Sequence, residues 1–371
     1  MKILFVTFGP ELIPSSRTRV YQYLPFFEKD NIIYKVVNNF NSIPYLLTNY
    51  FNSSQVNIKC GVISKIIHLF FFTLISIGHL FNIIYSLFQN IRVTLLIVFG
   101  KYNVLFIQKV FFPVFLIKIY KYYIKLIIFD FDDAIYIQKG LFRNQKQFNR
   151  LVPFYDLIVL ENTDSDQYVK GLGHINTLLI TGPIDTARYY PIHNNVNNNK
   201  IIIGWIGSPS TQSYIYLISE VLQRLCNKYN NVILETIGAG NLNIDNIQIS
   251  KKDWNLETEV NNLRNFDIGI MPLTDDDWAK GKGGYKLLQY MAMGIPCCAS
   301  PVGINKQLIV EGSTGFLVNG QEDWFDKLSY LIENKSIRDK MGMNGRKRVK
   351  EFYSLEVAAN KFTDIIKSIN K

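Results

Sequence analysis

The sequence has few residues of the kinds that redox and metal sites need. Its 371 residues include four cysteines and four histidines. The cysteines are too few and too unevenly spaced for a disulfide framework or a CxxC metal knuckle. They are Cys60, Cys226, Cys297 and Cys298. This scarcity disfavours a zinc or redox function and predicts a reducing, cytoplasmic compartment.

The commonest phosphate-binding motifs are missing as well. No GxGxxG follows the apolar runs Lys2–Phe8 and Ile201–Trp205, and no GxxxxGK[ST] occurs anywhere in the chain. These motifs mark dinucleotide-binding folds and P-loops respectively. A bound phosphate must therefore be held in another way.

The basic charge is concentrated in the first half. Residues 1–190 hold 19 Lys and Arg and 11 Asp and Glu, a net of +8, whereas residues 191–371 hold 21 and 19, a net of +2. Compositional drift toward lysine explains this excess about as well as a basic face that meets an anionic membrane or a phosphorylated lipid.

Residues 66–91 carry no formal charge and are long enough to span a bilayer. Their uncharged polar residues fall on one helical stripe, which favours a helix packed within the domain, then interfacial membrane contact, over a spanning helix. Residues 117–125 combine lysines with aromatic side chains, as protein segments at a membrane boundary do. A buried strand edge with solvated lysines explains this composition nearly as well. We therefore expect peripheral membrane contact through residues 66–91 and 117–125.

Short apolar strands alternate with helical segments along most of the chain, which predicts parallel sheets covered on both faces. Strands are expected at Lys2–Phe8, Val104–Gln108, Leu126–Phe129, Leu157–Leu160, Ile201–Trp205, Val232–Ile237, Ile268–Met271 and Cys297–Ala299. Helices are expected at Arg19–Lys29, 66–91, Asp164–Lys170, Ser213–Lys228, Glu257–Arg264 and Tyr285–Met293. A linker over Thr181–Lys200 separates the two arrays. The prediction is an α/β protein of two Rossmann-like domains, with the active site in the cleft between them.

The strongest candidate for a binding site is the segment from Gly281 to Gln289. Gly283 and Gly284 precede a helix whose apolar residues face a core, so free N–H groups and the helix dipole can hold an anion. Lys282 and Lys286 add two charges at the same point. The alternative is a flexible basic loop on the surface.

The tract Gly281–Gly303 resembles the donor-binding signature of glycosyltransferase family 4, retaining enzymes of the GT-B fold. The agreeing segments are Ser15–Arg17, Arg19–Pro25, Asp130–Ala134, Ile184–Asp185, Ile203–Ser208 and Glu311–Leu317. The resemblance implies an acceptor-side domain over residues 1–190, joined by a C-terminal helix at about residues 355–371. It implies a donor-binding domain over residues 191–354.

The resemblance and the residue pattern together define a candidate site. The catalytic candidates are Lys286 and Asp133. The donor-binding candidates are Gly207, Ser208, Ser210, Lys282, Gly283, Gly284, Tyr285, Lys286 and Gln289. The acceptor-side candidates are Gly9, Arg17, Arg19, Asp130 and Asp132. For the aspartates, capping of the following segment is an equal alternative, and Arg19 can equally begin an amphipathic helix.

The sequence departs from the family at two positions. The family usually carries two glutamates separated by seven residues, whose positions are here Gly281 and Gln289. The usual Arg and Lys after the first donor-domain strand are replaced by Ser208–Thr211. We expect Lys282 and Lys286 to hold the diphosphate in their place.

The implied reaction moves a sugar, with retention of configuration, from a nucleotide-diphosphate sugar to a glycan or lipid-linked acceptor in cell-surface polysaccharide or glycoconjugate synthesis. It needs no metal and no cofactor, although the aspartates at 130–133 could hold a divalent ion. No nucleic-acid partner is expected. A non-catalytic relative that binds nucleotide or glycan in an assembly is the alternative; a GT-B epimerase is disfavoured because the donor site has few acid–base side chains. The location expected is the cytoplasm, at the inner face of the membrane.

Overall fold

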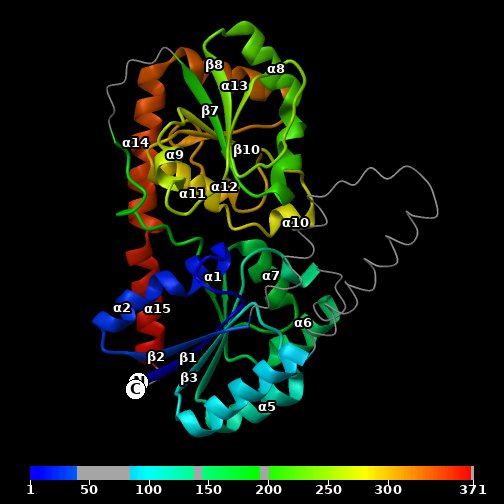
Figure 1. The fold of residues 1–371 in the computed structure, drawn as a ribbon, viewed down its shortest axis with the longest axis vertical. Coiled ribbons are helices and arrows are strands. Elements are labelled where there is room, and N and C mark those ends of the chain that lie inside the picture. The colour runs from blue at the N-terminus through cyan, green and yellow to red at the C-terminus, as the bar shows by residue number, and fades with distance from the viewer. Residues whose placement is uncertain (40–83, 138–143, 193–199, 369–371) are drawn as a thin grey trace, which may run out of the picture. The chain divides into compact units, whose positions relative to one another are not determined.

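The computed structural model describes residues 1–39, 84–137, 144–192 and 200–368. They form two compact units: unit 1 comprises residues 1–130 and 154–156, and unit 2 comprises residues 131–153 and 157–371. The strands make two six-stranded sheets, of order β2-β1-β3-β4-β5-β6 and β12-β11-β10-β7-β8-β9 (Figure 1). The predicted α/β class is confirmed, whereas the predicted domain boundary near residue 190 stays a prediction.

Unit 1 contains the first four strands and the helices that connect them. The strands are β1 (Lys2–Thr7), β2 (Ile33–Asn38), β3 (Val104–Gln108) and β4 (Leu126–Asp130). The helices are α1 (Pro14–Arg19), α2 (Leu24–Lys29), residues 84–100 and α5 (Val114–Tyr123). The pairings are parallel, with Ile3 opposite Val104 and Val104 opposite Leu126.

One predicted helix of unit 1 is divided. Residues 19–29 were expected as a single helix, but α1 ends at Arg19 and α2 begins at Leu24. Pro25 cannot donate a backbone hydrogen bond to a preceding turn, and it is tolerated here because it stands in the first turn of a new helix. Of the predicted uncharged helix, residues 66–83 lie outside the described residues, and residues 84–91 are helical.

Unit 2 begins with elements that follow β4. These are α6 (Gln145–Leu151), β5 (Leu157–Leu160), α7 (Thr163–Gly171) and β6 (Thr177–Leu179). The second sheet follows, with strands β7 (Ile201–Ile206), β8 (Val232–Ile237), β9 (Ile249–Lys252), β10 (Ile268–Met271), β11 (Cys297–Ala299) and β12 (Gly315–Leu317). Its helices are α8 (Ser219–Lys228), α9 (Glu259–Leu263), α10 (Asp277–Lys280), α11 (Tyr285–Ala292), α12 (Asn305–Leu308), α13 (Gln321–Glu333), α14 (Lys335–Phe352) and α15 (Leu355–Ser368). The expected helix at 213–228 is a 3-10 run (Pro209–Ile218) followed by α8.

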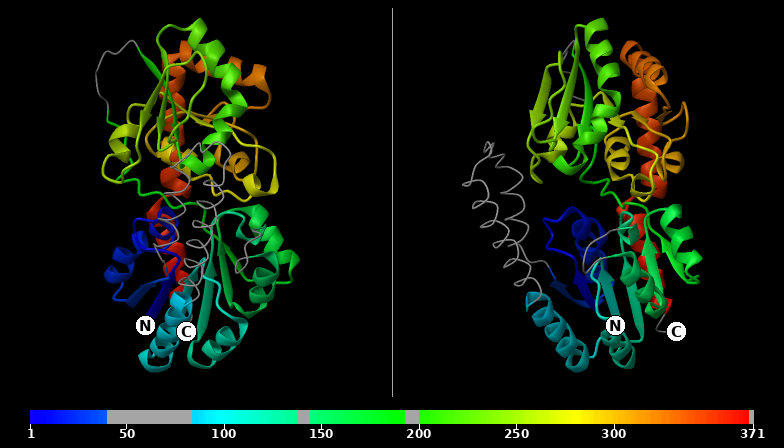
Figure 2. Two further views of the ribbon diagram at one scale, coloured as in Figure 1. Left: turned by 45° about the vertical axis from the view of Figure 1, so that its right-hand side comes forward. Right: turned by 90° about the vertical axis from the view of Figure 1, so that its right-hand side faces the viewer.

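The second sheet has helices on both faces (Figure 2). Side chains from α8 and α13 pack with one set of strand residues, and side chains from α9, α11 and α14 pack with the other set. The two faces alternate along β11, where Cys297 belongs to one core and Cys298 to the other, because successive strand side chains point to opposite faces. The sheet therefore fixes α11 firmly against one face.

α11 carries the predicted apolar face. Leu287, Leu288, Met291 and Ala292 are all fully buried, as expected from the sequence. Its C-terminal end lies against α14, where a Cβ on Gly342 would come within 1.8 Å of the carbonyl oxygen of Gly294. Packing therefore closes the C-terminal end of α11.

α15 begins at the predicted position. The backbone N–H of Leu355 donates to the carbonyl of Ile184 at 2.9 Å, and Ile184 pairs in parallel with Ser354. The expected packing of this helix on the acceptor-side domain stays a prediction. No described helix is long and apolar enough to cross a membrane.

Candidate active site

The glycine-rich loop of residues 281–284 leads directly into the N-terminus of α11. Gly284 is the N-cap and has a φ of 67°, in the left-handed region that glycine adopts without strain. A Cβ at this position would also lie 2.4 Å from Cδ1 of Leu308. The first turn of α11 begins directly afterwards with Tyr285, so its backbone N–H groups and the positive end of the helix dipole lie at the loop.

Lys286 lies in this first turn. Its Nζ is 5.3 Å from the centre of the Trp205 ring, at the end of β7. The absence of a side chain at Gly207 makes room for it, since a Cβ there would come within 2.9 Å of Cε of Lys286. The predicted donor residues Gly207 and Lys286 are thus brought together.

The ammonium group of Lys286 is more acidic than that of an ordinary lysine. Burial, reinforced by the charge of Lys282, lowers its pKa to about 8, and the carboxylate of Asp133 acts in the opposite direction. Lysine in water has a pKa of about 10.4, so the site disfavours the positive charge while no anion is bound. A diphosphate would supply the missing counter-charge.

Lys282 adds a second cation near Lys286. Its Nζ lies 5.5 Å from the centre of the Trp278 ring and 5.7 Å from the centre of the Tyr214 ring. Two ammonium groups, backed by aromatic faces and by the positive end of the α11 dipole, make a basic site suited to an anion with several oxygens.

Neighbouring groups require glycine at position 281 and crowd position 283. A Cβ on Gly281 would lie 2.4 Å from Cβ of Ala134, and a Cβ on Gly283 would lie 1.7 Å from Oε2 of Glu161. Both contacts are far inside van der Waals distance. There is no space at position 281 for the glutamate that the family usually carries there.

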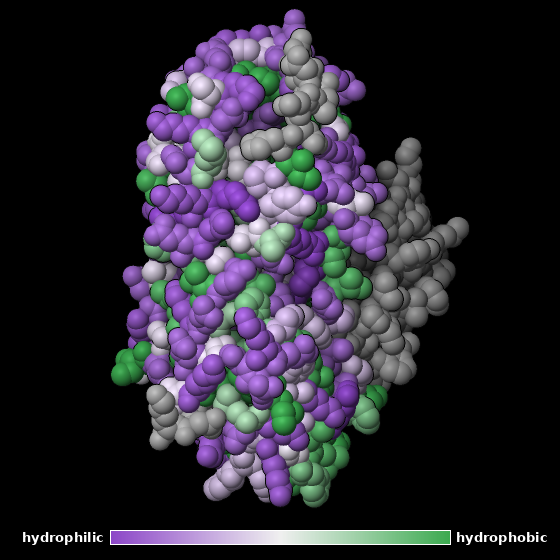
Figure 3. All heavy atoms as spheres, turned by 90° about the vertical axis from the view of Figure 1, so that its left-hand side faces the viewer, coloured by the Kyte–Doolittle hydropathy of each residue, from purple (hydrophilic) through white to green (hydrophobic). Residues whose placement is uncertain are grey.

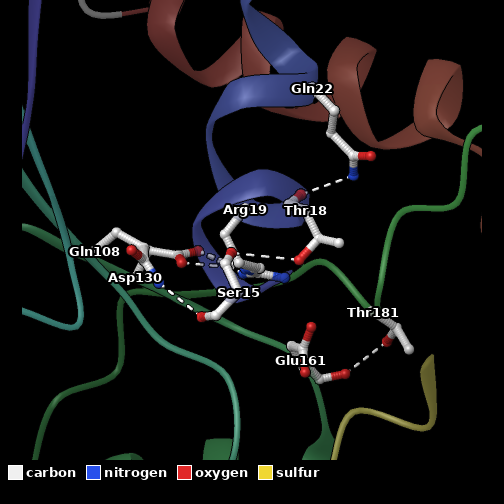
Figure 4. A network of polar contacts seen from close by, with 8 residues as sticks. All are labelled: Ser15, Thr18, Arg19, Gln22, Gln108, Asp130, Glu161 and Thr181. Carbon is white, nitrogen blue, oxygen red and sulfur yellow. Dashed lines mark hydrogen bonds and ion pairs between the residues drawn. The ribbon is translucent and has the colours of Figure 1, made fainter. Parts of the chain in front are cut away.

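A buried asparagine holds the loop in place. Nδ2 of Asn162 donates to the carbonyl of Gly281 at 2.8 Å, and its Oδ1 accepts from the N–H of Ser165 as the N-cap of α7. Next to it, the backbone carbonyl of Glu161 accepts from Oγ1 of Thr181 at 2.6 Å (Figure 4). Asn162 and Glu161 were missed at the sequence level, although an asparagine between a strand and a helix is an N-cap signal.

Gln289 takes part in a buried polar network. Its Nε2 donates to Oε1 of Glu259 at 3.2 Å and to the Tyr189 hydroxyl at 3.3 Å. Glu259 also accepts from Nε1 of Trp254 and from the Tyr189 hydroxyl. Burial, followed by the nearby Tyr285 and Glu259, raises the pKa of Tyr189 well above its usual value. No motif marked Glu259 in advance, since it lies 30 positions from Gln289.

The serines after β7 are exposed. The hydroxyls of Ser208 and Ser210 lie 2.8 Å apart, and the carbonyl of Ser208 accepts from the Thr211 N–H at 2.9 Å. The N–H of Gly207 donates to the carbonyl of Ile237 at 3.0 Å. This loop therefore presents two hydroxyl groups to solvent at the carboxyl end of β7.

Asp133 has a strained backbone. Its φ is 56°, which is uncommon outside glycine, and its carbonyl accepts from the Ile135 N–H at 3.0 Å. Its charge acts on both Lys286 and Tyr214. The neighbouring Asp132 is partly buried. The two catalytic candidates, Lys286 and Asp133, are therefore close enough to interact electrostatically within unit 2.

In unit 1, two acceptor-side candidates bind each other. Arg19 and Asp130 are each 1% exposed, and the guanidinium contacts the carboxylate through Nη2 at 2.5 Å and Nε at 3.0 Å (Figure 4). A buried pair of this kind costs about 3–5 kcal/mol when one partner is removed. The pair fixes the start of the chain to the end of β4.

The other unit 1 candidates lie in the turn after β1. The N–H of Gly9 donates to Oγ of Ser16 at 3.0 Å, and Ser16 in turn donates to Oε1 of Gln108. Arg17 is partly exposed and donates to the carbonyls of Glu11 and Leu12. Their acceptor roles stay predictions.

Among the residues that the structure describes, no group of three or more His, Cys, Asp or Glu side chains could hold a metal ion. This statement covers the aspartates at 130–133. The expected independence from metal stays a prediction.

Solved structures define the fold class. A glycosyltransferase from Rickettsia africae aligns with a TM-score of 0.69 at 15% identity, covering 100% of this chain and 98% of that chain. HepE of Anabaena, solved in complex with UDP and glucose, aligns with a TM-score of 0.64 at 12% identity, covering 99% of this chain and 100% of that chain. The fold is the GT-B fold of glycosyltransferases, which confirms the resemblance at that level.

The sequence comparisons concern mainly unit 2. Residues 200–334 match the family model Glycosyl transferases group 1. Trehalose synthase of Thermococcus litoralis is 36% identical over 73 residues, covering 20% of this chain and 18% of the relative. The capsular polysaccharide biosynthesis glycosyltransferase CapM of Staphylococcus aureus is 23% identical over 190 residues, covering 47% and 48%. The chain thus spans less than half of the length of these curated relatives, and family 4 stays a prediction.

Proposed function

We propose that the protein is a glycosyltransferase that moves a sugar from a nucleotide-diphosphate sugar to a glycan or lipid-linked acceptor. One observation carries the proposal: Lys282, Lys286 and the N-terminus of α11 lie together inside the segment that matches the family model. HepE, which shares the fold, is solved with UDP and glucose. CapM is named for capsular polysaccharide biosynthesis, which supports a role in cell-surface polysaccharide or glycoconjugate synthesis.

The proposed chemistry is stabilisation of the departing diphosphate. Cleavage of the sugar–phosphate bond develops negative charge on the phosphate oxygens, and donors fixed in advance lower the energy of that state. Lys286 and Lys282 supply charge, and the positive end of the α11 dipole adds to it. This set performs the task without a metal, as we propose, and retention of configuration follows the resemblance.

Asp133 is proposed to act on the acceptor side of the same site. Its charge is felt by Lys286, and its φ of 56° indicates a backbone held in place by its surroundings. We propose that its carboxylate orients an acceptor hydroxyl, while Ser208 and Ser210 bind the donor. Gly9, Arg17 and Asp132 remain the proposed acceptor side. Arg19 and Asp130 were proposed with them, but they are buried against each other, so we propose that they support this region instead of contacting the acceptor.

A second candidate function is supported by the departures from the family. Gly281 offers no side chain, and the amide N–H₂ of Gln289 is engaged by Glu259 and Tyr189. A protein with this site could bind nucleotide or glycan as a non-catalytic member of an assembly. Its prediction is binding without turnover.

Incubation with uridine, guanosine and adenosine diphosphate sugars separates the two functions. Diphosphate release is measured with and without EDTA, beside nucleotide binding by calorimetry, for the protein and for Lys286→Ala. Release that EDTA leaves unchanged and that Lys286→Ala abolishes supports the enzyme. Nucleotide binding with no release from any donor supports the non-catalytic function.

We also propose a cytoplasmic location at the inner face of the membrane. Cys226, Cys297 and Cys298 are free thiols, and burial raises the pKa of Cys226, which keeps it protonated and unreactive. Cys60 lies outside the described residues. Free thiols are typical of a reducing compartment.

A further inference from the structure

The helix of residues 84–100 is apolar on both sides. Gln89, Val93 and Ile97 form its buried side. The opposite side also consists of large apolar residues, and each of them is more than half exposed. They are Ile84, Leu87, Phe88, Ile91, Leu95 and Phe99. A helix that packs only on its own domain has polar residues on that outer side.

α5 continues the apolar surface. Phe115, Ile119 and Tyr122 fall at i, i+4 and i+7 on its solvent side and are 61%, 39% and 88% exposed. The two helices touch, since the hydroxyls of Thr94 and Tyr120 lie 3.0 Å apart. Ten of the 22 large apolar side chains exposed in the described residues belong to these two helices.

The two helices lie on the same face of the sheet. They precede β3 and β4, and the strand order β2-β1-β3-β4 makes both connections run in the same direction across the sheet. Right-handed crossovers that run in one direction place their helices on one face. Figure 3 shows hydrophobic side chains at the lower right of the molecule, over the helix of residues 84–100.

The sequence around these helices is basic, and among their lysines Lys121 is paired with Asp156 at 2.8 Å. Between Asp30 and Asp130 the sequence contains nine Lys and Arg residues and no Asp or Glu. Arg92 and Lys118 are exposed beside the apolar faces, and Lys125 follows α5. A surface with apolar and aromatic side chains at its centre and cations around it matches the boundary between acyl chains and anionic headgroups.

We propose that the outer faces of residues 84–100 and α5, here called the apolar shelf, bind the surface of a bilayer that contains anionic lipid. Phe88, Leu95 and Phe99 enter the acyl boundary, while Arg92 and Lys118 contact headgroup phosphates. The proposal concerns a surface of unit 1 and does not depend on the proposed activity. It sharpens the predicted contact at 66–91 and 117–125 by assigning it to the outer faces of two helices.

Flotation of the full chain with vesicles tests the shelf. Vesicles of phosphatidylcholine alone and with about a third phosphatidylglycerol are compared, for the protein and for the double variant Leu95→Gln/Phe99→Gln. We expect binding to anionic vesicles that falls at high salt, and a loss of at least about tenfold in the double variant. The matched control is Met343→Gln, which changes an apolar side chain on α14 that is 66% exposed. This variant should bind the vesicles as the protein does.

Other occupants of the shelf give different results. Absence of vesicle binding overturns the proposal. A double variant that converts a dimer to a monomer without lipid shows that a second copy covers the shelf. A large fall in its melting temperature shows that the chain itself covers the shelf. Either result also overturns the proposal. Equal nucleotide binding by the protein and the double variant shows that the loss of vesicle binding does not come from damage to the donor site.

Discussion

Binding of a nucleoside diphosphate should depend on the protonation of Lys286. Its pKa is lowered to about 8 by burial and by Lys282, and a bound diphosphate would raise it again. The protonated lysine binds the anion, so affinity is complete below the free-state pKa and is lost as the pH rises through it. The effect follows from linkage between proton and ligand.

The expected magnitude can be worked from that pKa. For a group with a pKa of about 8 that must be protonated, the apparent dissociation constant increases about fourfold between about pH 7 and about pH 8.5, or about 0.8 kcal/mol. Lys286→Arg keeps its charge throughout this range and should show no such increase. Lys286→Ala should bind about 10- to 100-fold more weakly at about pH 7, since a hydrogen bond to a charged group contributes about 1.5–3 kcal/mol. Because alanine does not titrate, this difference should shrink about fourfold by about pH 8.5, where most of the lysine in the protein has lost its charge.

Titration calorimetry with a nucleoside diphosphate at the two pH values provides the measurement. The arginine variant is the control, because any titration of the ligand affects both proteins equally. If the protein and Lys286→Arg respond to pH in the same way, Lys286 does not titrate in the binding range. If Lys286→Ala binds normally, the lysine does not contact the diphosphate, and the reasoning fails.

Three further predictions concern the same site. Gly281→Glu restores the family's residue, but its Cβ would lie 2.4 Å from Cβ of Ala134; we expect lower thermal stability and lower donor turnover, and a rise in turnover would contradict the packing argument. Gln289→Glu places a carboxylate where Nε2 now lies 3.2 Å from Oε1 of Glu259, so two buried carboxylates would face each other. We expect the free energy of unfolding, measured by urea denaturation, to fall by about 2–4 kcal/mol at neutral pH and by less in acid. Lys286→Met should raise the free energy of unfolding at neutral pH by about 1–3 kcal/mol, because a lysine with a pKa below its unfolded value destabilises the fold wherever it is charged. If the variant is still more stable than the protein above about pH 10, the gain in stability has another cause.

The central strands of both sheets could be predicted from the sequence, whereas the outer strands were missed. The eight predicted strands are the inner strands of the two sheets, while β2, β6, β9 and β12 are the edges. Inner strands are buried on both faces and form continuous apolar runs. The edge strand β9, Ile-Ser-Lys-Lys, has no such run, because none of its residues is fully buried.

The candidate site divides in the same way between local and long-range information. The start of α11 could be predicted because its glycines, lysines and apolar face lie within a dozen residues. Glu161, Asn162 and Glu259 could not, because their contacts with the glycine loop or with Gln289 join residues 30 to about 120 positions apart. Ala134 beside Gly281 and Glu259 beside Gln289 are consistent with the residues found at these two positions.

The N-terminus of α11, Lys286 and the preceding Lys282 should together hold the diphosphate of a nucleotide sugar. Calorimetric titration with uridine, guanosine and adenosine diphosphates measures this binding for the protein, for Lys282→Ala/Lys286→Ala, and for the exposed control Lys347→Ala. We expect at least one nucleotide to bind the protein and the control, with a loss of about 100-fold or more in the double variant. Equal affinity in all three proteins would contradict it.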